Sequence, residues 1–209
     1  MLPDGTTFDE IAARFRWSIP DRYNIGVDAC DRWAEREPGR TALIQVDASG
    51  TARTVSFGAL RGLSNRFANL LRRHGIGPGE RVGILLPQCV ETALAHLGTY
   101  KAGAIAIPLF GLFGPEALAF RLRDSGARAV VTDRVGAGKL AAIRAELPDL
   151  RTVWSVDGPG DGAADLPSGL GQEADAFDPV PSRADDPALI IYTSGTTGQP
   201  KGALHAHRV

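Results

Sequence analysis

The hydrophobic positions of residues 82–156 alternate between short apolar runs and longer stretches with helical spacing. The short runs fall at 82–86, 104–107, 129–131 and 152–156. The stretches between them follow Pro87, start at Gly114, and extend from Lys139 to Leu147. Short buried strands that alternate with helices are typical of βαβ units. The pattern therefore predicts the α/β class, with a mostly parallel sheet flanked by helices on both faces.

The residues before this region show periodic patterns of their own. Apolar stripes predict helices from Phe8 to Arg16 and from Asn24 to Glu37, and alternation around a turn predicts a β-hairpin over 42–55. Ser56 then precedes a long stretch with apolar residues every three to four positions, which predicts a capped helix. We expect the first helix to pack onto the surface of the domain.

A change of composition marks residues 157–187. Glycine, proline and acidic residues crowd this stretch and interrupt both helical and strand periodicity. We therefore predict an acidic, solvated and mobile connection without regular structure.

The chemistry of the sequence is concentrated in the segment YTSGTTGQPKG, from Tyr192 to Gly202. It continues the apolar run 188–192, which predicts another buried strand. Glycines allow the backbone to approach a ligand and to turn successive N–H groups toward an anion. The hydroxyl groups add hydrogen-bond donors, and Lys201 adds a full positive charge. These residue types together predict a phosphate-binding loop.

Two other phosphate-binding patterns do not fit. The loop of nucleotide triphosphatases requires G-x-x-x-x-G-K-[ST], whereas Gly195 and Gly198 are three residues apart and Gly202 follows Lys201. The string GAGK at 136–139 also fails, because leucine follows the lysine in place of Ser or Thr. Neither segment therefore indicates a triphosphatase.

The segment YTSGTTGQPKG resembles, without a departure, the phosphate-loop signature of the acyl-adenylate-forming (AMP-binding) superfamily. That superfamily includes acyl-CoA synthetases, the adenylation domains of peptide synthetases, and luciferases. The string YNIGVDACDRWAERE, which ends at Glu37, is similar to the opening helix of short- and medium-chain acyl-CoA synthetases of the acetyl-CoA synthetase kind. The resemblance covers residues 24–209 and is strongest at their end.

The resemblance implies which residues bind the nucleotide. Carried over one by one, the phosphate-binding residues are Thr193, Ser194, Gly195, Thr196, Thr197, Gly198 and Lys201. Lys201 is also expected to act in catalysis, because its charge opposes that of the departing pyrophosphate. The family's ligands for Mg²⁺ and its residues for adenine and ribose are expected outside this chain, and we predict no metal site within it.

The reaction implied by the resemblance joins a carboxylic acid to coenzyme A. The carboxylate attacks ATP to give an acyl-adenylate and pyrophosphate, and coenzyme A then displaces AMP to form a thioester. Residues 1–23 are then an N-terminal extension, and residues 24–209 are part of the large AMP-binding domain, truncated after the phosphate loop. The family's C-terminal domain is absent, so we expect these residues to be inactive alone.

Two alternatives stay open. The first is the amino-acid adenylation domain of a peptide synthetase, which shares the same loop signature. The second is a non-catalytic nucleotide-binding fragment. The identity of the carboxylic acid is also open, because the family builds its acyl pocket largely from residues beyond this chain.

Composition narrows the classes of partner. Hydrophobic residues make up 44% of the chain and charged residues 22%, with a net charge of −1, which gives no general attraction to nucleic acid or to anionic membranes. No apolar run is long enough to span a bilayer, and the start has no signal-peptide core. Cys30 and Cys89 lack metal-ligand spacing and are predicted to be reduced thiols. Together these features predict a cytoplasmic protein.

An apolar loop at residues 108–114 follows a predicted strand, at the edge where open α/β sheets bind ligands. Two interpretations exist: the loop packs against another domain, which we favour, or it lines an acyl pocket. His205 and His207 alternate with apolar residues, which indicates one face of a strand rather than a pair of metal ligands.

Overall fold

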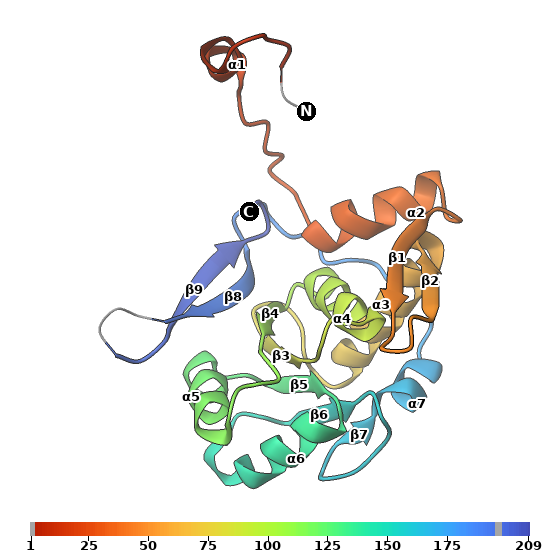
Figure 1. Cartoon of the computed structure of the whole chain (residues 1–209), viewed down its shortest axis with the longest axis vertical. Coiled ribbons are helices and arrows are strands. Elements are labelled where there is room, and N and C mark those ends of the chain that lie inside the picture. The colour runs from red at the N-terminus through yellow and green to blue at the C-terminus, as the bar shows by residue number, and fades with distance from the viewer. Residues whose placement is uncertain (1–2, 195–197) are drawn as a thin grey trace.

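A seven-stranded sheet forms the centre of the computed structural model, which describes residues 3–194 and 198–209 (Figure 1). The strands lie in the order β7-β6-β5-β3-β4-β8-β9; neighbours from β7 to β8 pair in parallel, and β9 runs antiparallel at the edge. Their bounds are β3 Arg81–Leu85, β4 Ile105–Pro108, β5 Ala129–Thr132, β6 Thr152–Ser155, β7 Ala164–Asp165, β8 Pro187–Thr193 and β9 Lys201–Ala206. The predicted α/β class with a mostly parallel sheet is confirmed.

Helices cover both faces of this sheet. Phe67, Leu94 and Leu170 bring α3, α4 and α7 into one hydrophobic core, whereas Leu122 and Leu140 bring α5 and α6 into a second core on the other face. The bounds are α3 Phe57–Arg73, α4 Val90–Lys101, α5 Pro115–Ser125, α6 Arg134–Ala142 and α7 Leu166–Gly171. None of the helices in the described ranges is long and apolar enough to cross a membrane.

The helix predicted over 139–147 is displaced toward the N-terminus. α6 begins at Arg134, because the Asp133 Oδ1 atom accepts the Gly136 N–H at 2.7 Å and caps the first turn. The end of the predicted stretch is a separate 3₁₀ turn, η2 (Arg144–Glu146). The sequence pattern did not predict this helix start, because Gly136 and Gly138 lie in the first turns and glycine is a poor helix former.

Regular structure lies within residues 157–187, which corrects the prediction of an irregular connection. β7 extends the sheet beside β6, and α7 packs on α3. Leu166 is 1% exposed and Leu170 is 8% exposed, so two leucines attach the segment to the core. Asp165, one of the acidic residues that suggested a solvated loop, caps α7 by accepting the Ser168 N–H at 2.9 Å.

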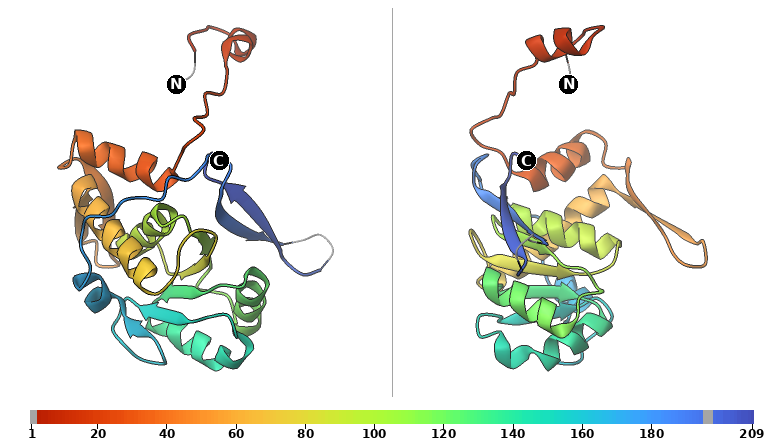
Figure 2. Two further views of the ribbon diagram at one scale, coloured as in Figure 1. Left: turned by 180° about the vertical axis from the view of Figure 1, so that it is seen from behind. Right: turned by 60° about the vertical axis from the view of Figure 1, so that its left-hand side comes forward.

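The N-terminal helix α1 (Phe8–Arg14) forms where it was predicted, with the Thr7 hydroxyl accepting the Glu10 N–H at 3.3 Å. None of its residues is buried, and Figures 1 and 2 show it standing clear of the remaining elements. Phe8 and, beyond the helix, Trp17 are both about four-fifths exposed. The prediction that this helix packs onto the domain surface was therefore wrong.

Two further predicted elements precede the sheet. β1 (Thr41–Val46) and β2 (Ala52–Ser56) pair antiparallel as a separate hairpin. The helix predicted over 24–37 forms as a π-helical turn, η1 (Val27–Asp31), followed by α2 (Arg32–Arg36). Asn24 stands at its start, where the side-chain oxygen accepts the Gly26 N–H at 3.0 Å.

A buried ion pair joins this opening helix to α4. The Lys101 ammonium lies 2.6 Å from a carboxylate oxygen of Asp31 and donates to the side chains of Ser64 and Asn65 on α3, both at 2.8 Å. Lys101 is fully buried and Asp31 is 5% exposed. Burial lowers the pKa of Lys101, and Asp31 opposes this shift by favouring the charged form. The sequence contained no signal for this cluster, because both residues look like surface positions of amphipathic helices.

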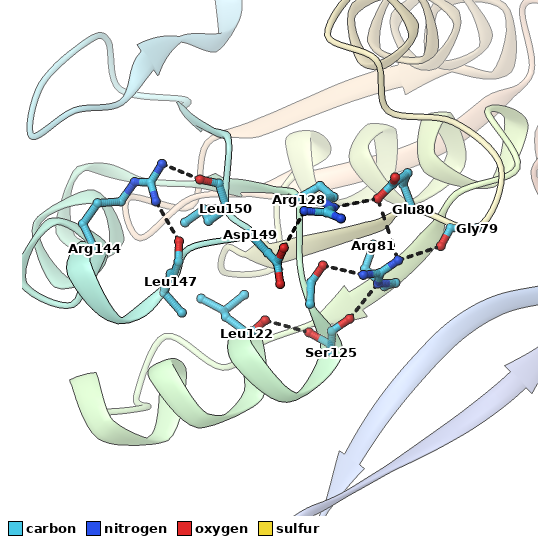
Figure 3. A network of polar contacts seen from close by, with 11 residues as sticks. Gly79, Glu80, Arg81, Leu122, Ser125, Arg128, Arg144, Leu147, Asp149 and Leu150 are labelled. Carbon is cyan, nitrogen blue, oxygen red and sulfur yellow. Dashed lines mark hydrogen bonds and ion pairs between the residues drawn. The ribbon is translucent and has the colours of Figure 1, made fainter.

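A second polar network fixes the amino ends of β3 and β5 (Figure 3). Arg128 donates to the carboxylate of Glu80 at 3.1 Å and to that of Asp149 at 2.6 Å. Arg81 donates from its Nε atom to the Ser125 carbonyl oxygen at 2.6 Å. These contacts lie at the opposite edge of the sheet from the strand ends that carry the predicted site.

We predict that Asp31→Ala lowers the free energy of unfolding by about 3–5 kcal/mol, because it leaves the Lys101 charge buried without its counter-charge. Asp185→Ala is the matched control, because Asp185 pairs with Arg208 at 2.8 Å on the exposed surface. The control should cost less than about 1 kcal/mol. Urea unfolding of both variants at pH 7 measures the difference, and equal losses would contradict the role of the buried pair.

Candidate active site

The β8–β9 hairpin brings predicted site residues together. Tyr192 lies opposite Gly202 and Thr193 lies opposite Lys201 in the antiparallel register. Residues 194–200 connect the two strands and are called the glycine-rich loop below. The hydroxyl group of Thr193 and the ammonium group of Lys201 therefore belong to the two residues at its base.

Part of the predicted phosphate-binding set lies within the described residues. These residues are Thr193, Ser194, Gly198 and Lys201, and all of them are exposed. Gly195, Thr196 and Thr197 lie outside the described residues. Gly198 has a φ of 126°, in the region that favours glycine. Exposed hydroxyl groups with a lysine at the base of the same loop provide the donors that a phosphate requires.

This loop begins at the edge of the sheet where the parallel strands end. β3 ends at Leu85 and β4 ends at Pro108; β8 runs parallel to β4, with Ala106 opposite Leu189, and ends at Thr193. Open α/β sheets bind their ligands at this carboxyl edge. The apolar loop at 108–114 and the glycine-rich loop therefore follow neighbouring strands at the edge suited to a ligand.

A cavity of about 560 Å³ opens at the same edge, between β1, the start of α4 and the ends of β3 and β4. Leu43 and Phe110 line it with apolar surface, and Cys89, Thr92 and His96 add polar groups. Leu112, farther along the apolar loop, is 97% exposed. The loop at 108–114 thus lines a cavity, as an acyl pocket requires, and also presents bare apolar surface, as domain packing requires.

His96 lines this cavity and is paired with the buried side chain of Tyr100. The His96 Nδ1 atom lies 3.1 Å from the Tyr100 hydroxyl oxygen. Burial lowers the pKa of His96 to about 4 and raises the pKa of Tyr100 to about 12. Both side chains are therefore neutral at pH 7, and they present a hydrogen-bonding pair without a charge.

One contact of the site was missed in the sequence, where Tyr192 was assigned to the end of a strand predicted to be buried and to the start of the YTSGTTGQPKG segment. Of β8, only Ala188 is buried. The Tyr192 hydroxyl donates to an Asp124 carboxylate oxygen at 2.6 Å, and the Arg121 carbonyl oxygen lies 3.2 Å away. The Tyr192 ring packs edge-on against Phe120. Desolvation, and then the neighbouring Asp124 carboxylate, raise the pKa of Tyr192. The side chain therefore ties β8 to α5 directly before the glycine-rich loop.

A family model described as AMP-binding enzyme matches residues 30–209. The chain belongs to the AMP-binding enzyme family. The match includes the whole sheet, both loops at its carboxyl edge and the cavity lined by the apolar loop. The resemblance seen in the YTSGTTGQPKG segment is thereby confirmed at the level of the family.

This AMP-binding chain has named relatives among bacterial synthetases. It is 32% identical over 220 residues to acetyl-coenzyme A synthetase of Sodalis glossinidius (strain morsitans), which covers 96% of this chain and 34% of the relative. It is 33% identical over 218 residues to acetyl-coenzyme A synthetase of Parvibaculum lavamentivorans, with the same two coverages. The chain thus spans about a third of the length of these curated relatives.

Solved structures of ligases also match this chain over part of their length. An acyl-CoA synthetase from Brucella canis superposes with a TM-score of 0.85 at 30% identity, over 96% of this chain and 38% of that one. The anthranilate CoA ligase AuaEII, in complex with anthranoyl-AMP, superposes with a TM-score of 0.80 at 27% identity, over 91% and 36% of the two chains. The AMP-binding chain therefore shares its architecture with the first part of longer ligases.

We predict that His96 makes the stability of the fold depend on pH between about 6.5 and 4. Its folded pKa of about 4 lies below the ordinary value of 6.5, so the unfolded chain takes up the proton first as the pH falls. Stability from this group is complete above pH 6.5 and is lost toward pH 4, by up to about 3 kcal/mol. His96→Phe should flatten this part of the curve.

Urea unfolding of both proteins at intervals from pH 7.5 to pH 4.5 tests this prediction. Carboxylates titrate in both proteins, so the difference between the two curves isolates the histidine. Parallel curves would contradict the lowered pKa of His96.

Proposed function

We propose that this chain supplies the ATP phosphate-binding loop of an acyl-CoA synthetase that activates a carboxylic acid as an acyl-adenylate. Membership of the AMP-binding family supports the adenylate chemistry. The relatives, acetyl-coenzyme A synthetases and an acyl-CoA synthetase, support the thioester product. The observation that carries the proposal is the pairing of Thr193 with Lys201, which places a hydroxyl and an ammonium group at the base of one exposed loop.

The proposed reaction has two steps. A carboxylate oxygen of the acid attacks the α-phosphorus of ATP, and the bond from that phosphorus to the bridging oxygen of pyrophosphate breaks. The thiolate sulfur of coenzyme A then attacks the acyl carbon of the adenylate, and AMP leaves. Negative charge grows on pyrophosphate during the first step, so groups that hold the β- and γ-phosphates stabilise that transition state.

Each residue of the loop has a role in this proposal. Phosphate oxygens accept hydrogen bonds from two kinds of donor. These are the hydroxyl groups of Thr193, Ser194, Thr196 and Thr197 and the backbone N–H groups at Gly195 and Gly198. Lys201 adds a positive charge and acts as the catalytic residue of the set. Removal of one well-placed donor of this kind typically raises the barrier by about 3 kcal/mol.

The remaining ligands of the proposed reaction are Mg²⁺ and coenzyme A. In the described parts of the chain, no group of three or more His, Cys, Asp or Glu side chains is arranged to hold a metal ion. The family resemblance, and not this absence, is the basis for proposing that the protein ligands of Mg²⁺ lie outside this chain, and no step is derived through the metal. Coenzyme A enters the proposal as the second substrate. The proposed cytoplasmic location of the protein rests on its composition, its polar start and its two cysteines without metal-ligand spacing.

The domain division belongs to the same proposal. Residues 1–23 are an extension, and residues 24–209 are part of the large AMP-binding domain. The exposed helix α1 supports the first boundary, and the family match over 30–209 supports the second. Within that domain, residues 157–187 connect β6 to β8 with β7 and α7 between them.

We predict that Lys201→Ala lowers the turnover number for carboxylate-dependent pyrophosphate exchange by about 100-fold in the complete protein that carries these residues. Arg151→Ala is the matched control, because it removes a positive charge at the amino edge of the sheet, before β6 and away from the loop. This control should leave the exchange rate unchanged. Lys201→Arg should recover part of the activity because it restores the charge. Unchanged exchange by Lys201→Ala would remove the assigned role.

We also predict that residues 1–209 alone do not catalyse exchange with any member of a carboxylic-acid panel, because they span about a third of the relatives' length. The complete protein should respond to short- or medium-chain fatty acids. A response to amino acids in their place would favour a peptide-synthetase adenylation domain. Activity of the 209 residues alone would refute this part of the proposal.

A further inference from the structure

The β8–β9 hairpin is attached to the sheet near its base. Within the described residues, β4 and β8 are in register at one pair, Ala106 with Leu189. β8 continues for four residues beyond that pair, to Thr193, and its other neighbour is the edge strand β9. Figures 1 and 2 show the hairpin leaving the body of the domain at one side. The outer end of β8 therefore needs a contact other than pairing with β4.

The side chain of Tyr192 makes that contact. Its hydroxyl donates to Asp124 at 2.6 Å and lies near the Arg121 carbonyl oxygen, and both partners belong to α5. Tyr192 directly precedes Thr193, the first residue of the proposed phosphate-binding set. The three residues Tyr192, Asp124 and Arg121 are called the tyrosine anchor below.

Gly202 leaves space for this arrangement from the opposite strand. A Cβ atom at Gly202 would lie 2.9 Å from a methyl group of Ile190 and 3.3 Å from the Tyr192 ring. Cross-strand partners point to the same face of a sheet, so any larger residue at this position would push the ring. Gly202, the last glycine of the sequence motif, thus leaves room for the Tyr192 ring.

Arg121 extends the anchor to the apolar loop. It is 8% exposed, and its guanidinium carbon lies 4.0 Å from the Phe113 ring centre and 5.7 Å from that of Tyr192. Its Nη1 atom donates to the Ala117 carbonyl oxygen at 2.8 Å, while its buried Nε–H has no hydrogen-bond partner among the described residues. A buried cation held between two rings connects the loop at 108–114 to the strand that carries the glycine-rich loop.

We propose that Tyr192, held by Asp124 and Arg121, is a positioning residue that keeps Thr193 and Lys201, at the base of the glycine-rich loop, in position for ATP. It acts through the adjacent Thr193. The inference rests on the proposed function, because its ligand is the ATP of that reaction. Without the anchor, a smaller fraction of molecules holds Thr193 and Lys201 in position for ATP. The apparent affinity for ATP falls in proportion to that fraction. Bound ATP restores the position, so turnover at saturation is kept.

The first experiment measures steady-state kinetics of Tyr192→Phe in the complete protein. The KM for ATP should rise about 3- to 10-fold, while kcat stays within about twofold of the wild-type value. Tyr23→Phe is the matched control, because the Tyr23 hydroxyl donates to Asp28 at 2.9 Å in a similar tyrosine–aspartate pair away from the loop. A KM that does not change, or a loss confined to kcat, would overturn the inference.

A double-substitution cycle shows whether the two side chains act as one unit. Asp124→Ala alone should raise the KM for ATP to the same degree as Tyr192→Phe, and the double variant should be no worse than either. Additive losses would show that the hydroxyl and the carboxylate act separately and would contradict the anchor.

Hydrogen exchange of the 209-residue chain provides a readout that needs no activity. Amides of Thr193 and Lys201 should exchange faster in Tyr192→Phe than in wild type, while amides of β3 should keep their protection. Equal exchange at the hairpin would refute the anchor even if the enzyme is active. Faster exchange with no ATP-dependent reaction by the wild-type complete protein would instead keep the anchor and refute the proposed function.

Discussion

The parallel pairing of β3 with β4, and of β4 with β8, determines where the chemistry of this chain lies. Parallel neighbours run in the same direction, so the strands that end at Leu85, Pro108 and Thr193 point toward the same edge of the sheet although they are far apart in sequence. The same pairing requires helical crossovers, which bury both faces of the sheet. One constraint on strand direction thus produces the core, the cavity and the direction of the strand that leads to the glycine-rich loop.

The crossover helices also carry the polar groups that fix neighbouring segments. α4 supplies Lys101, which binds Asp31 of the opening helix in a fully buried setting. α5 supplies Asp124, which binds Tyr192 at the more exposed side of the domain. Burial determines how much stability the loss of each contact costs. Loss of the first leaves an unpaired buried charge, which is costly, whereas loss of the second, more exposed contact should cost less.

Sequence reasoning predicted the regular part of the fold because hydrophobic periodicity reports burial directly. It failed where a few residues outweigh composition: Leu166 and Leu170 attach a segment whose glycines and acidic residues suggested a loop. It also failed for α1, because an apolar stripe predicts a helix but does not identify a partner. A pattern over one element contains no information about which other element completes its contacts.

The candidate site shows the same division between local and distant information. Thr193, Ser194 and Lys201 could be selected from the sequence, because phosphate chemistry needs hydroxyl groups, glycines and a cation within one short segment. The contact of Tyr192 with Asp124 joins positions 68 residues apart, and no local pattern marks such a pair. The cavity beside the apolar loop at 108–114 likewise combines residues of β1, α4 and two strand ends.

In a glycine-rich loop, the residues that bind a ligand are different from the residues that hold the loop in position. Glycines allow the backbone to approach an anion, but they have no side chains with which to pack against the domain. The position of such a loop must therefore be set by the residues that flank it. Here Thr193 and Lys201 set its base through their register, and Tyr192 connects that base to α5. Under the proposed function, a substitution next to the loop would then change ATP binding although it removes no group that meets a phosphate.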